Sequence, residues 1–219
     1  MARHTFDNEL QELKVELVKM AGMVEGQIGE SMTAFKTKND NLAKEVIDKD
    51  RMIDDMEKSI ERRCLSLILK QQPVAKDLRT VSTALKMVTD LERIGDHAAD
   101  IADVVLSMQG EHIYEIVQHI PAMAEVSSDM VHNSIVAFVT EDITLAKATI
   151  AADDKLDDLY CKVKDEVVDI LKSDPEKSDV SVNFLVIAKY FERIGDHAEN
   201  ICDWIEFSET GEYKHQRIL

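Results

Sequence analysis

Apolar side chains recur every three or four residues along nearly the whole chain, which is the period of an amphipathic α-helix that faces a core. The first stripe of this kind runs from Phe6 to Phe35. Similar stripes predict five further helices, at about residues 42–70, 75–109, 113–139, 142–171 and 179–207. A helix of about 30 residues is about 45 Å long. The pattern therefore predicts an all-α fold of six long helices, in which short connections make neighbouring helices antiparallel.

Polar residues, prolines and one glycine separate the predicted helices. The segment Lys38–Asn41 offers N-cap side chains for the second helix. Pro73 ends that helix, because proline inside a helix costs about 3 kcal/mol. Residues Ser173–Pro175 close the matching hairpin in the second half, and Gly110 is a candidate C-cap for the third helix. Pro121 either kinks the fourth helix or starts its regular part.

The chain contains an internal duplication. The seven residues 92–98 return unchanged as residues 192–198, and similarity continues outward at offsets of 100 and, further upstream, 103. A repeat of about 100 residues is far longer than a solenoid repeat, so each copy is expected to be a small domain with its own core. The sequence thus predicts two tandem pseudo-symmetric three-helix bundles, residues 1–109 and 111–219, related by a pseudo-twofold axis.

The composition agrees with helices and restricts the partners. Only 7 glycines and 3 prolines leave few places for the tight turns of a sheet protein. The formal net charge of -17 would repel a phosphate backbone or an anionic lipid surface, so neither nucleic acid nor direct membrane insertion is expected. Cations and basic protein surfaces are the natural partners of such a chain.

The cysteines and the apolar runs indicate the compartment. Cys64, Cys161 and Cys202 show no C-x-x-C spacing, so we expect packed, reduced thiols rather than disulfides or a thiolate metal site. The first residues lack the apolar core of a signal peptide, and no apolar run reaches the roughly 18 residues of a membrane span. We therefore expect a soluble, intracellular protein.

Acidic residues recur as pairs four positions apart, which places their carboxylates side by side on a helix. In an antiparallel hairpin, residues equidistant from the turn lie level, and positions 54 and 92, like 50 and 96, have their midpoint at Pro73. The second copy repeats this arrangement about its own turn. The four carboxylates predicted to meet in each half are Asp50, Asp54, Glu92 and Asp96, and then Asp153, Asp157, Glu192 and Asp196.

Such clusters are costly unless a cation lies among them. Two unit charges about 6 Å apart repel by about 0.7 kcal/mol in water and by about 3 kcal/mol at an effective dielectric near 20. Sites built only from carboxylates suit hard ions such as Ca, Mg, Mn or oxidised iron, and they do not suggest structural zinc. The alternative is an ordinary solvated acidic face. Because the arrangement recurs in both halves, we favour metal binding.

Glycines and further acids accompany the pairs. Gly95 and Gly195 lie inside predicted helices, where glycine costs about 1 kcal/mol relative to alanine. Close helix packing is the favoured explanation, and clearance for a metal cluster is the alternative. Asp103 and Asp203 return to the acidic stripe at helical period and are weaker ligand candidates.

Histidine and arginine also flank the pairs. His97 and His197 each follow an aspartate directly, but the Glu-x-x-His spacing of di-iron bundles is absent. We interpret both histidines as surface residues or supports behind the ligands. Arg93 and Arg193 are expected to neutralise flanking charge without facing the acid pairs.

These motifs resemble those of the PhoU family, the accessory and regulatory proteins of bacterial and archaeal phosphate uptake. The resemblance covers nearly the whole chain and rests on Leu-Glu-Arg-Ile-Gly-Asp-His-Ala at 91–98, Phe-Glu-Arg-Ile-Gly-Asp-His-Ala at 191–198, and the Asp-x-x-x-Asp motifs at 50–54 and 153–157. It implies two three-helix bundles that hold multinuclear iron or zinc clusters through the eight carboxylates named above. The ligand chemistry itself favours iron or manganese over zinc.

The resemblance also implies a role and partners. It suggests a negative regulator that contacts the ATPase subunit of the phosphate ABC transporter and a membrane sensor histidine kinase, and so represses the phosphate-starvation response when phosphate is plentiful. Such a protein would be cytoplasmic and would reach the membrane only through these partners. Two similar faces suit a partner that is itself a dimer, and the sequence leaves open whether the chain forms a homodimer.

Two other functions stay open at this point. One is a carboxylate-bridged metalloenzyme, and the other is a metal-free helical adaptor. The sequence shows no Ser-His-Asp spacing, no P-loop and no G-x-G-x-x-G, so we expect no catalytic residues and no enzyme activity. Metal analysis would distinguish the adaptor from the regulator.

Overall fold

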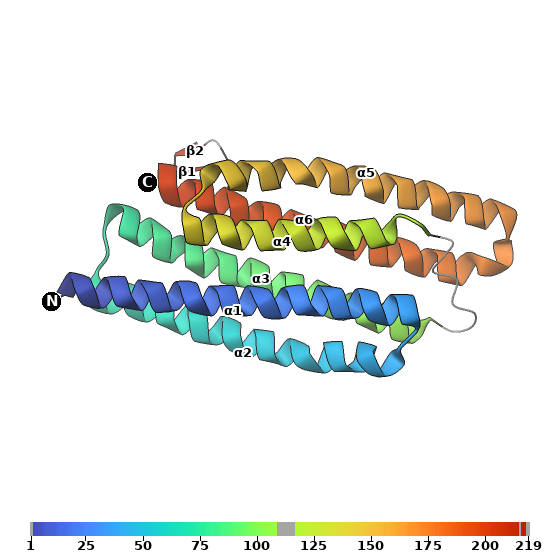
Figure 1. The fold of residues 1–219 in the computed structure, drawn as a ribbon, viewed down its shortest axis with the longest axis horizontal. Helices are drawn as coiled ribbons and strands as arrows, with labels where there is room; N and C mark the ends of the chain where they lie inside the picture. The colour runs from blue at the N-terminus through green and yellow to red at the C-terminus, as the bar shows by residue number, and fades with distance from the viewer. Residues whose placement is uncertain (1, 109–116, 215, 218–219) are drawn as a thin grey trace.

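A computed structural model describes residues 2–108, 117–214 and 216–217 of the chain. In this part of the chain six helices follow one another up and down (Figure 1). They are α1 Ala2–Thr37, α2 Asp40–Gln71, α3 Ala75–Ser107, α4 Ile120–Thr140, α5 Ile143–Ser173 and α6 Ser178–Thr210. A short 3₁₀ helix, η2, covers Pro175–Lys177 ahead of α6. The predicted all-α fold of six long helices is therefore confirmed.

The helix boundaries follow the signals in the sequence. The side chain of Asn39 caps α2 by accepting a hydrogen bond from the backbone N–H of Leu42 at 3.1 Å. Asp142 caps α5 in the same way, accepting from the N–H of Thr144 at 2.8 Å. Pro73 lies in the connection between α2 and α3. N-cap residues therefore begin α2 and α5, and a proline follows the end of α2, close to the positions that the sequence predicts.

The start of the fourth helix answers the question posed by Pro121. This proline lies in the first turn of α4, where its missing N–H costs no hydrogen bond, so it begins the helix and does not kink it. The start predicted near Ile113 and the boundary predicted at Gly110 lie outside the described residues, but residues 117–119, which were predicted to be helical, precede α4. The predicted C-cap at Gly110 is also wrong, because α3 ends at Ser107 with Met108 as its C-cap.

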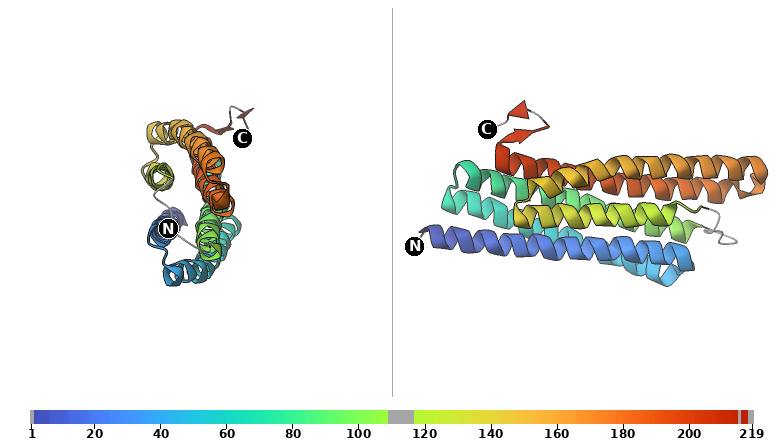
Figure 2. Two further views of the ribbon diagram at one scale, coloured as in Figure 1. Left: turned by 90° about the vertical axis from the view of Figure 1, so that its right-hand side faces the viewer. Right: turned by 45° about the horizontal axis from the view of Figure 1, so that its top comes forward.

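The helices gather as α1–α3 and α4–α6, and the two groups lie beside each other (Figure 1). Within each group every helix contacts the other two, and α3 packs along α6 between the groups. The end-on view in Figure 2 shows α5, α6, α3 and α2 along an arc, with α1 and α4 on its inner side. The third helix of each half, α3 or α6, therefore packs against its own half on one side and against the other third helix on the other side.

One continuous core runs through both halves, instead of the two separate cores expected from the duplication. Phe35 of α1 packs edge-on against Phe184 of α6, with ring centroids 5.8 Å apart. Thr83 of α3 donates a hydrogen bond to the backbone carbonyl of Trp204 in α6 at 3.0 Å. The cores merge because α3 and α6 bury side chains against each other as well as against their own halves. The division of the chain near residue 110 remains a prediction.

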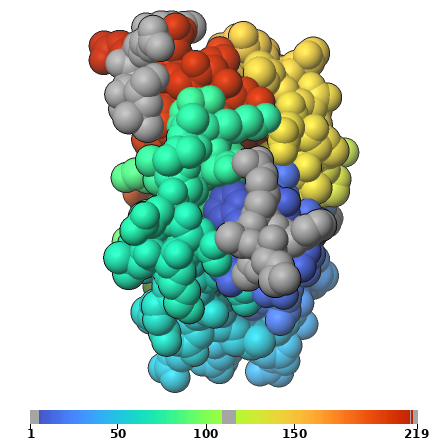
Figure 3. Space-filling view, turned by 90° about the vertical axis from the view of Figure 1, so that its left-hand side faces the viewer, coloured from blue at the N-terminus to red at the C-terminus, as the bar shows by residue number. Residues whose placement is uncertain are grey.

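Ionic contacts join the halves at the end of the molecule that faces the viewer in Figure 3. Lys76, at the start of α3, lies 3.0 Å from Glu141 and 2.9 Å from Glu209 near the end of α6. Lys14 of α1 lies 3.1 Å from the same Glu141. Exposed ion pairs are individually worth little, but these share their partners and form a network across the halves.

The chain after α6 forms a small hairpin that the sequence did not predict. α6 continues past its predicted end at Phe207 to Thr210, and its C-cap is Gly211, whose φ of 80° favours glycine. β1 (Glu212–Tyr213) then pairs antiparallel with β2 (Gln216–Arg217). The ring of Tyr213 stacks on Trp204 at 4.1 Å between centroids. Strands of two residues have no periodicity that a sequence could reveal.

The cysteines agree with the expectation at two of three positions. Cys64 and Cys202 are buried, whereas Cys161 is exposed on α5, so the prediction of a packed thiol is wrong there. Cys161 lies on the outward side of the helix, two positions before the buried Val163. No helix in the described part of the chain combines the length and the apolar character that crossing a bilayer requires.

Candidate metal centre

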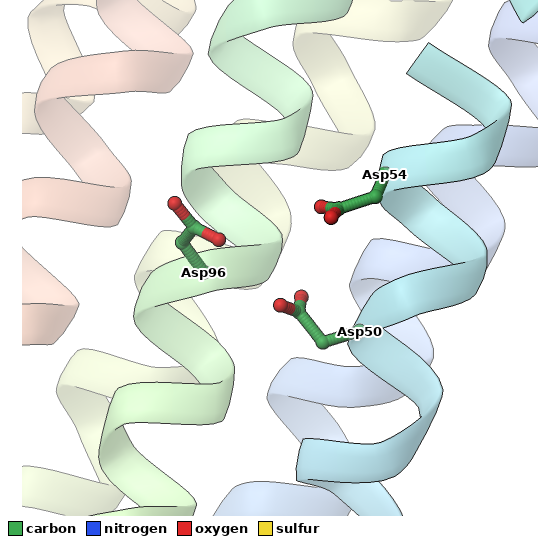
Figure 4. A group of neighbouring side chains, drawn as sticks. All are labelled: Asp50, Asp54 and Asp96. Carbon is green, nitrogen blue, oxygen red and sulfur yellow. The ribbon is translucent and has the colours of Figure 1, made fainter. Parts of the chain in front are cut away.

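Three aspartates of the first half converge between α2 and α3 (Figure 4). Asp50 and Asp54 lie one turn apart on α2, and Asp96 faces them from α3. One carboxylate oxygen from each lies within 4.8 Å of the others. The spacing of four residues and the turn at Pro73 place these groups level with one another. At this separation two full charges repel by about 3.5 kcal/mol if the effective dielectric is near 20.

Glu92, the fourth predicted carboxylate of this half, does not join the close group of oxygens. Its side chain is only 12% exposed, and its Oε2 lies 3.2 Å from Nε of Arg93. Arg93 also reaches Asp96, with Nη1 2.6 Å from Oδ2. The prediction that Arg93 faces away from the acid pair is therefore wrong, because its long side chain folds back along the helix surface.

A second close group lies between α5 and α6. Asp153, Asp196 and Glu199 each offer a carboxylate oxygen within 4.8 Å of the others. Asp153 and Asp196 occupy the predicted level positions, but Glu199 was missed by sequence reasoning. The predicted acidic pairs occupy matched positions in both repeats, whereas residue 99, the counterpart of Glu199 in the first half, is alanine. The spacing of three residues between Asp196 and Glu199 was the available signal.

The other acids of the second half lie around this group. Asp157 and Glu192 are near enough to raise the pKa of Asp153, but their oxygens lie outside the close group. Glu192 Oε1 instead accepts a hydrogen bond from Lys189 at 2.5 Å. Asp203, a weaker candidate, lies 3.2 Å from Lys214. The two halves therefore share a plan but not an identical set of contacts.

Burial and mutual repulsion raise the pKa values of carboxyls in both groups. Burial, followed by the charge of Asp96, raises the pKa of Asp50 to about 6 and that of Glu92 to about 7. In the second half, burial and then the charge of Glu199 raise the pKa of Asp153 to about 7. Raised values mean that the ionised carboxylates are poorly compensated by the protein itself. A bound cation would compensate them.

Buried carboxylate oxygens without a hydrogen-bond partner support this interpretation. Among the described residues they include Asp153 Oδ1 and Glu192 Oε2. An ionised carboxylate can only accept hydrogen bonds, so neighbouring carboxylates cannot satisfy one another. Oxygen-only donors of this kind fit a hard cation such as manganese, oxidised iron, magnesium or calcium.

Gly95 and Gly195 allow the close approach of the helices that carry the acids. A Cβ at Gly95 would lie 3.0 Å from Ile53 Cδ1. A Cβ at Gly195 would overlap the Leu156 side chain and lie 3.0 Å from Asp153 Oδ1. Close packing therefore explains both glycines. In the second half the same space also leaves room for the Asp153 carboxylate, so the alternative of clearance at the acidic group applies there too.

His97 and His197 lie at the contact between α3 and α6, and so are not surface residues. His197 Nδ1 lies 2.8 Å from Asp90 Oδ1, which joins one half of the chain to the other. His97 Nδ1 lies 3.4 Å from Asp100 Oδ2, and burial lowers the pKa of His97. The side chains of the two histidines are 13% and 24% exposed respectively. They support the contact between the halves behind the acidic groups.

Comparison with known proteins decides the family. The family model described as the PhoU domain matches the chain twice, over residues 17–105 and 120–205. The chain belongs to the PhoU family. It is 40% identical to the phosphate-specific transport system accessory protein PhoU homolog of Clostridium acetobutylicum, over 96% of this chain and 97% of that relative. Identity to the accessory protein PhoU of Escherichia coli K12 is 31%, over 96% and 88%.

Solved PhoU structures have the same fold. The crystal structure of the phosphate transport system regulatory protein PhoU from Streptococcus pneumoniae matches with a TM-score of 0.86 at 29% identity, over 95% of this chain and 98% of that chain. PhoU from Pseudomonas aeruginosa matches with a TM-score of 0.86 at 31% identity, over 94% and 100%. The PhoU-like fold expected from the motifs is thereby confirmed over nearly the whole chain.

Proposed function

We propose that the chain is a metal-binding regulator of inorganic phosphate uptake that acts on a phosphate-specific transport system. The relatives from Clostridium acetobutylicum and Escherichia coli are named as accessory proteins of such a system. The proposal of metal binding rests on the close group of carboxylates that occurs once in each half. In each half the second and third helices bring together three carboxylates, and burial and mutual repulsion raise the pKa of Asp50 and of Asp153 although Arg93 pairs with Asp96.

The ligands come from two helices in each half. Asp50, Asp54 and Asp96 would hold a cation between α2 and α3, and Asp153, Asp196 and Glu199 would hold one between α5 and α6. Glu92, Asp157 and Glu192 lie beside these groups and would extend each site to more than one ion, as in a multinuclear cluster. A bound cation supplies positive charge that removes the repulsion. Iron or manganese suits this oxygen-only donor set better than zinc does.

The proposed partners are proteins of the phosphate response. We place the ATPase subunit of the phosphate ABC transporter and a membrane sensor histidine kinase in this role, with the protein on the cytoplasmic side of the membrane. The net charge of -17 favours a partner with a basic surface, which it would steer into contact. Acidic groups on both halves suit a partner that is itself a dimer. Repression of the starvation response would follow from these contacts.

Metal analysis of protein purified without an affinity tag tests the metal part. Relative to wild type, Asp50→Asn with Asp96→Asn should remove about half of the bound metal, because one of two sites is lost. Adding Asp153→Asn with Asp196→Asn should remove nearly all of it.

The matched control for these variants is Asp55→Asn with Asp158→Asn, which changes exposed aspartates at repeat-related positions of the same helices. The control should keep its metal. Unchanged metal content in the quadruple variant would leave only the solvated-face interpretation.

Fractionation of cells tests the partner part. The protein should sediment with membranes when the transporter and kinase are present and remain in the supernatant when both are deleted. Deletion of the protein should leave phosphate uptake or the starvation response poorly restrained in phosphate-rich medium. Normal repression in the deletion strain would overturn the regulatory role.

A further inference from the structure

The first helix of each half directs a different side chain at the acidic group. In the first half this residue is Gln27 of α1, which is only 3% exposed. Its amide nitrogen donates to the backbone carbonyl of Val46 at 3.3 Å, and its side chain lies beside the carboxyl group of Asp50. Its Oε1 is buried without a hydrogen-bond partner and lies 3.3 Å from where a Cβ of Gly95 would be. Gln27 therefore lies beside the acidic group, on a third helix.

Met130 of α4 takes the matching place in the second half. It lies 103 positions after Gln27, the same offset that relates Asp50 to Asp153. It is 1% exposed, and its Cε lies 3.6 Å from where a Cβ of Gly195 would be. A thioether has no hydrogen to donate. Accordingly, Asp153 Oδ1 has no hydrogen-bond partner, whereas its counterpart Asp50 has an amide beside it.

We propose that Gln27 is a positioning residue of the first cation site: when a cation binds, its amide supports Asp50, and its buried, neutral carbonyl oxygen serves the same site. The two halves of the chain then bind cations differently, since the second half has methionine at this position and recruits Glu199 instead. This inference rests on the proposed metal binding and concerns its selectivity.

The chemistry of the amide explains why the difference matters. A ligand that is already hydrogen bonded in its binding orientation loses less freedom when a cation arrives, and the loss of such a support commonly lowers metal affinity 10–100-fold. The burial of a polar amide oxygen without a partner is also unusual in folded proteins. A cation, or a water bound to it, would satisfy this oxygen without adding charge to an already acidic group.

Titration calorimetry of the metal-free, full-length protein with Mn²⁺ tests the inference through a reciprocal exchange. The wild type should show two classes of binding events. Glu199→Gln identifies the class that belongs to the second half, because position 99 in the first half is alanine. Gln27→Met should weaken the other class about 10–100-fold and leave the Glu199 class unchanged. Met130→Gln should instead strengthen the Glu199 class.

Each outcome bears on a different claim. Circular dichroism melts first establish that the exchanged variants are folded. If Gln27→Met binds Mn²⁺ in both classes as the wild type does, or weakens both classes equally, the role of Gln27 is overturned while metal binding stands. If the wild type binds no Mn²⁺ at millimolar concentration, the proposed metal binding itself fails.

Discussion

The imidazole rings of His97 and His197 lie 5.5 Å apart, centroid to centroid, at the contact between α3 and α6. They occupy the same place in the repeated heptapeptide, so the duplicated motif meets itself at the centre of the molecule. The hydrogen bond between His197 and Asp90 adds a polar interaction to this contact. The motif that carries an acidic side chain on one side of each helix therefore also fastens the halves together on the other.

The pair formed by His197 and Asp90 should contribute measurably to stability. His197→Ala or Asp90→Asn should each lower the free energy of unfolding by about 1–3 kcal/mol, because the change leaves a largely buried partner unsatisfied. Denaturant unfolding of both single variants and the double variant gives their coupling energy. His132→Ala is the control, since His132 also contacts the other half, at Glu25, but its side chain is 60% exposed. Equal effects at the two sites would contradict a specific role for the buried pair.

The metal-free protein should lose stability as the pH rises from about 4 to about 7. Burial and nearby carboxylates raise the pKa of Asp153 to about 7, whereas an unfolded chain ionises aspartate near 4. Between these values the folded state binds more protons than the unfolded state, so stability falls with increasing pH. After allowance for partial exposure, the loss from Asp153 is on the order of 1 kcal/mol, or about 2–4 °C in Tm.

Asp153→Asn removes this ionisation and isolates its effect. The Tm of the variant relative to wild type should increase between pH 5 and pH 8 in the presence of a chelator. Asp169→Asn, at an exposed position of α5, should show the same difference at both pH values. A Tm difference for Asp153→Asn that does not change with pH would show that Asp153 is ionised throughout.

Substitution of glycine by alanine should change the stability of the protein in opposite directions at two positions. At Gly26 of α1 an added Cβ would have no neighbouring atom within 4 Å, so Gly26→Ala should stabilise by about 0.5–1 kcal/mol through helix propensity. Gly195→Ala would press against Leu156 and Asp153 and should destabilise by about 1–3 kcal/mol. Thermal melts of the metal-free variants compare the two. A stabilised Gly195→Ala variant would mean that α5 and α6 can separate at little cost.

The single tryptophan reports on the hairpin after α6. Trp204 is stacked by Tyr213, so Tyr213→Ala should shift its fluorescence emission to longer wavelength by admitting water. The stability cost should be about 0.5–1.5 kcal/mol, the usual worth of an aromatic pair. Tyr160→Ala, on α5, serves as the comparison. An unshifted spectrum in the Tyr213 variant would show that the hairpin does not cover the indole in solution.

The sequence predicted what depends on period and spacing. Helices, caps and the level placement of Asp50 and Asp96 about Pro73 follow from rules that act within one hairpin. Glu199 was not predicted as a site residue because it has no acidic counterpart at residue 99. The prediction for Arg93 was wrong because a long side chain is not confined to its own helix face.

The shared core could not be predicted for a different reason. An apolar stripe shows that a helix is buried, but it does not say which helices bury it. Phe35 and Phe184 belong to different halves, and nothing in either stripe distinguishes a partner in the same repeat from one in the other. The contact between α3 and α6 arises only when both copies are folded together.

A fragment that ended at residue 108 would leave Phe35 and Thr83 without the α6 side that covers them. Such a fragment has one obvious substitute, which is a second copy of itself, with His97 meeting His97 in place of His197. Its folding would then depend on protein concentration. The covalent connection between the halves turns that association into an intramolecular step with a high effective concentration. The full chain is thus a tethered dimer of two repeats. Because the two repeats no longer have identical sequences, their acidic groups can differ from each other.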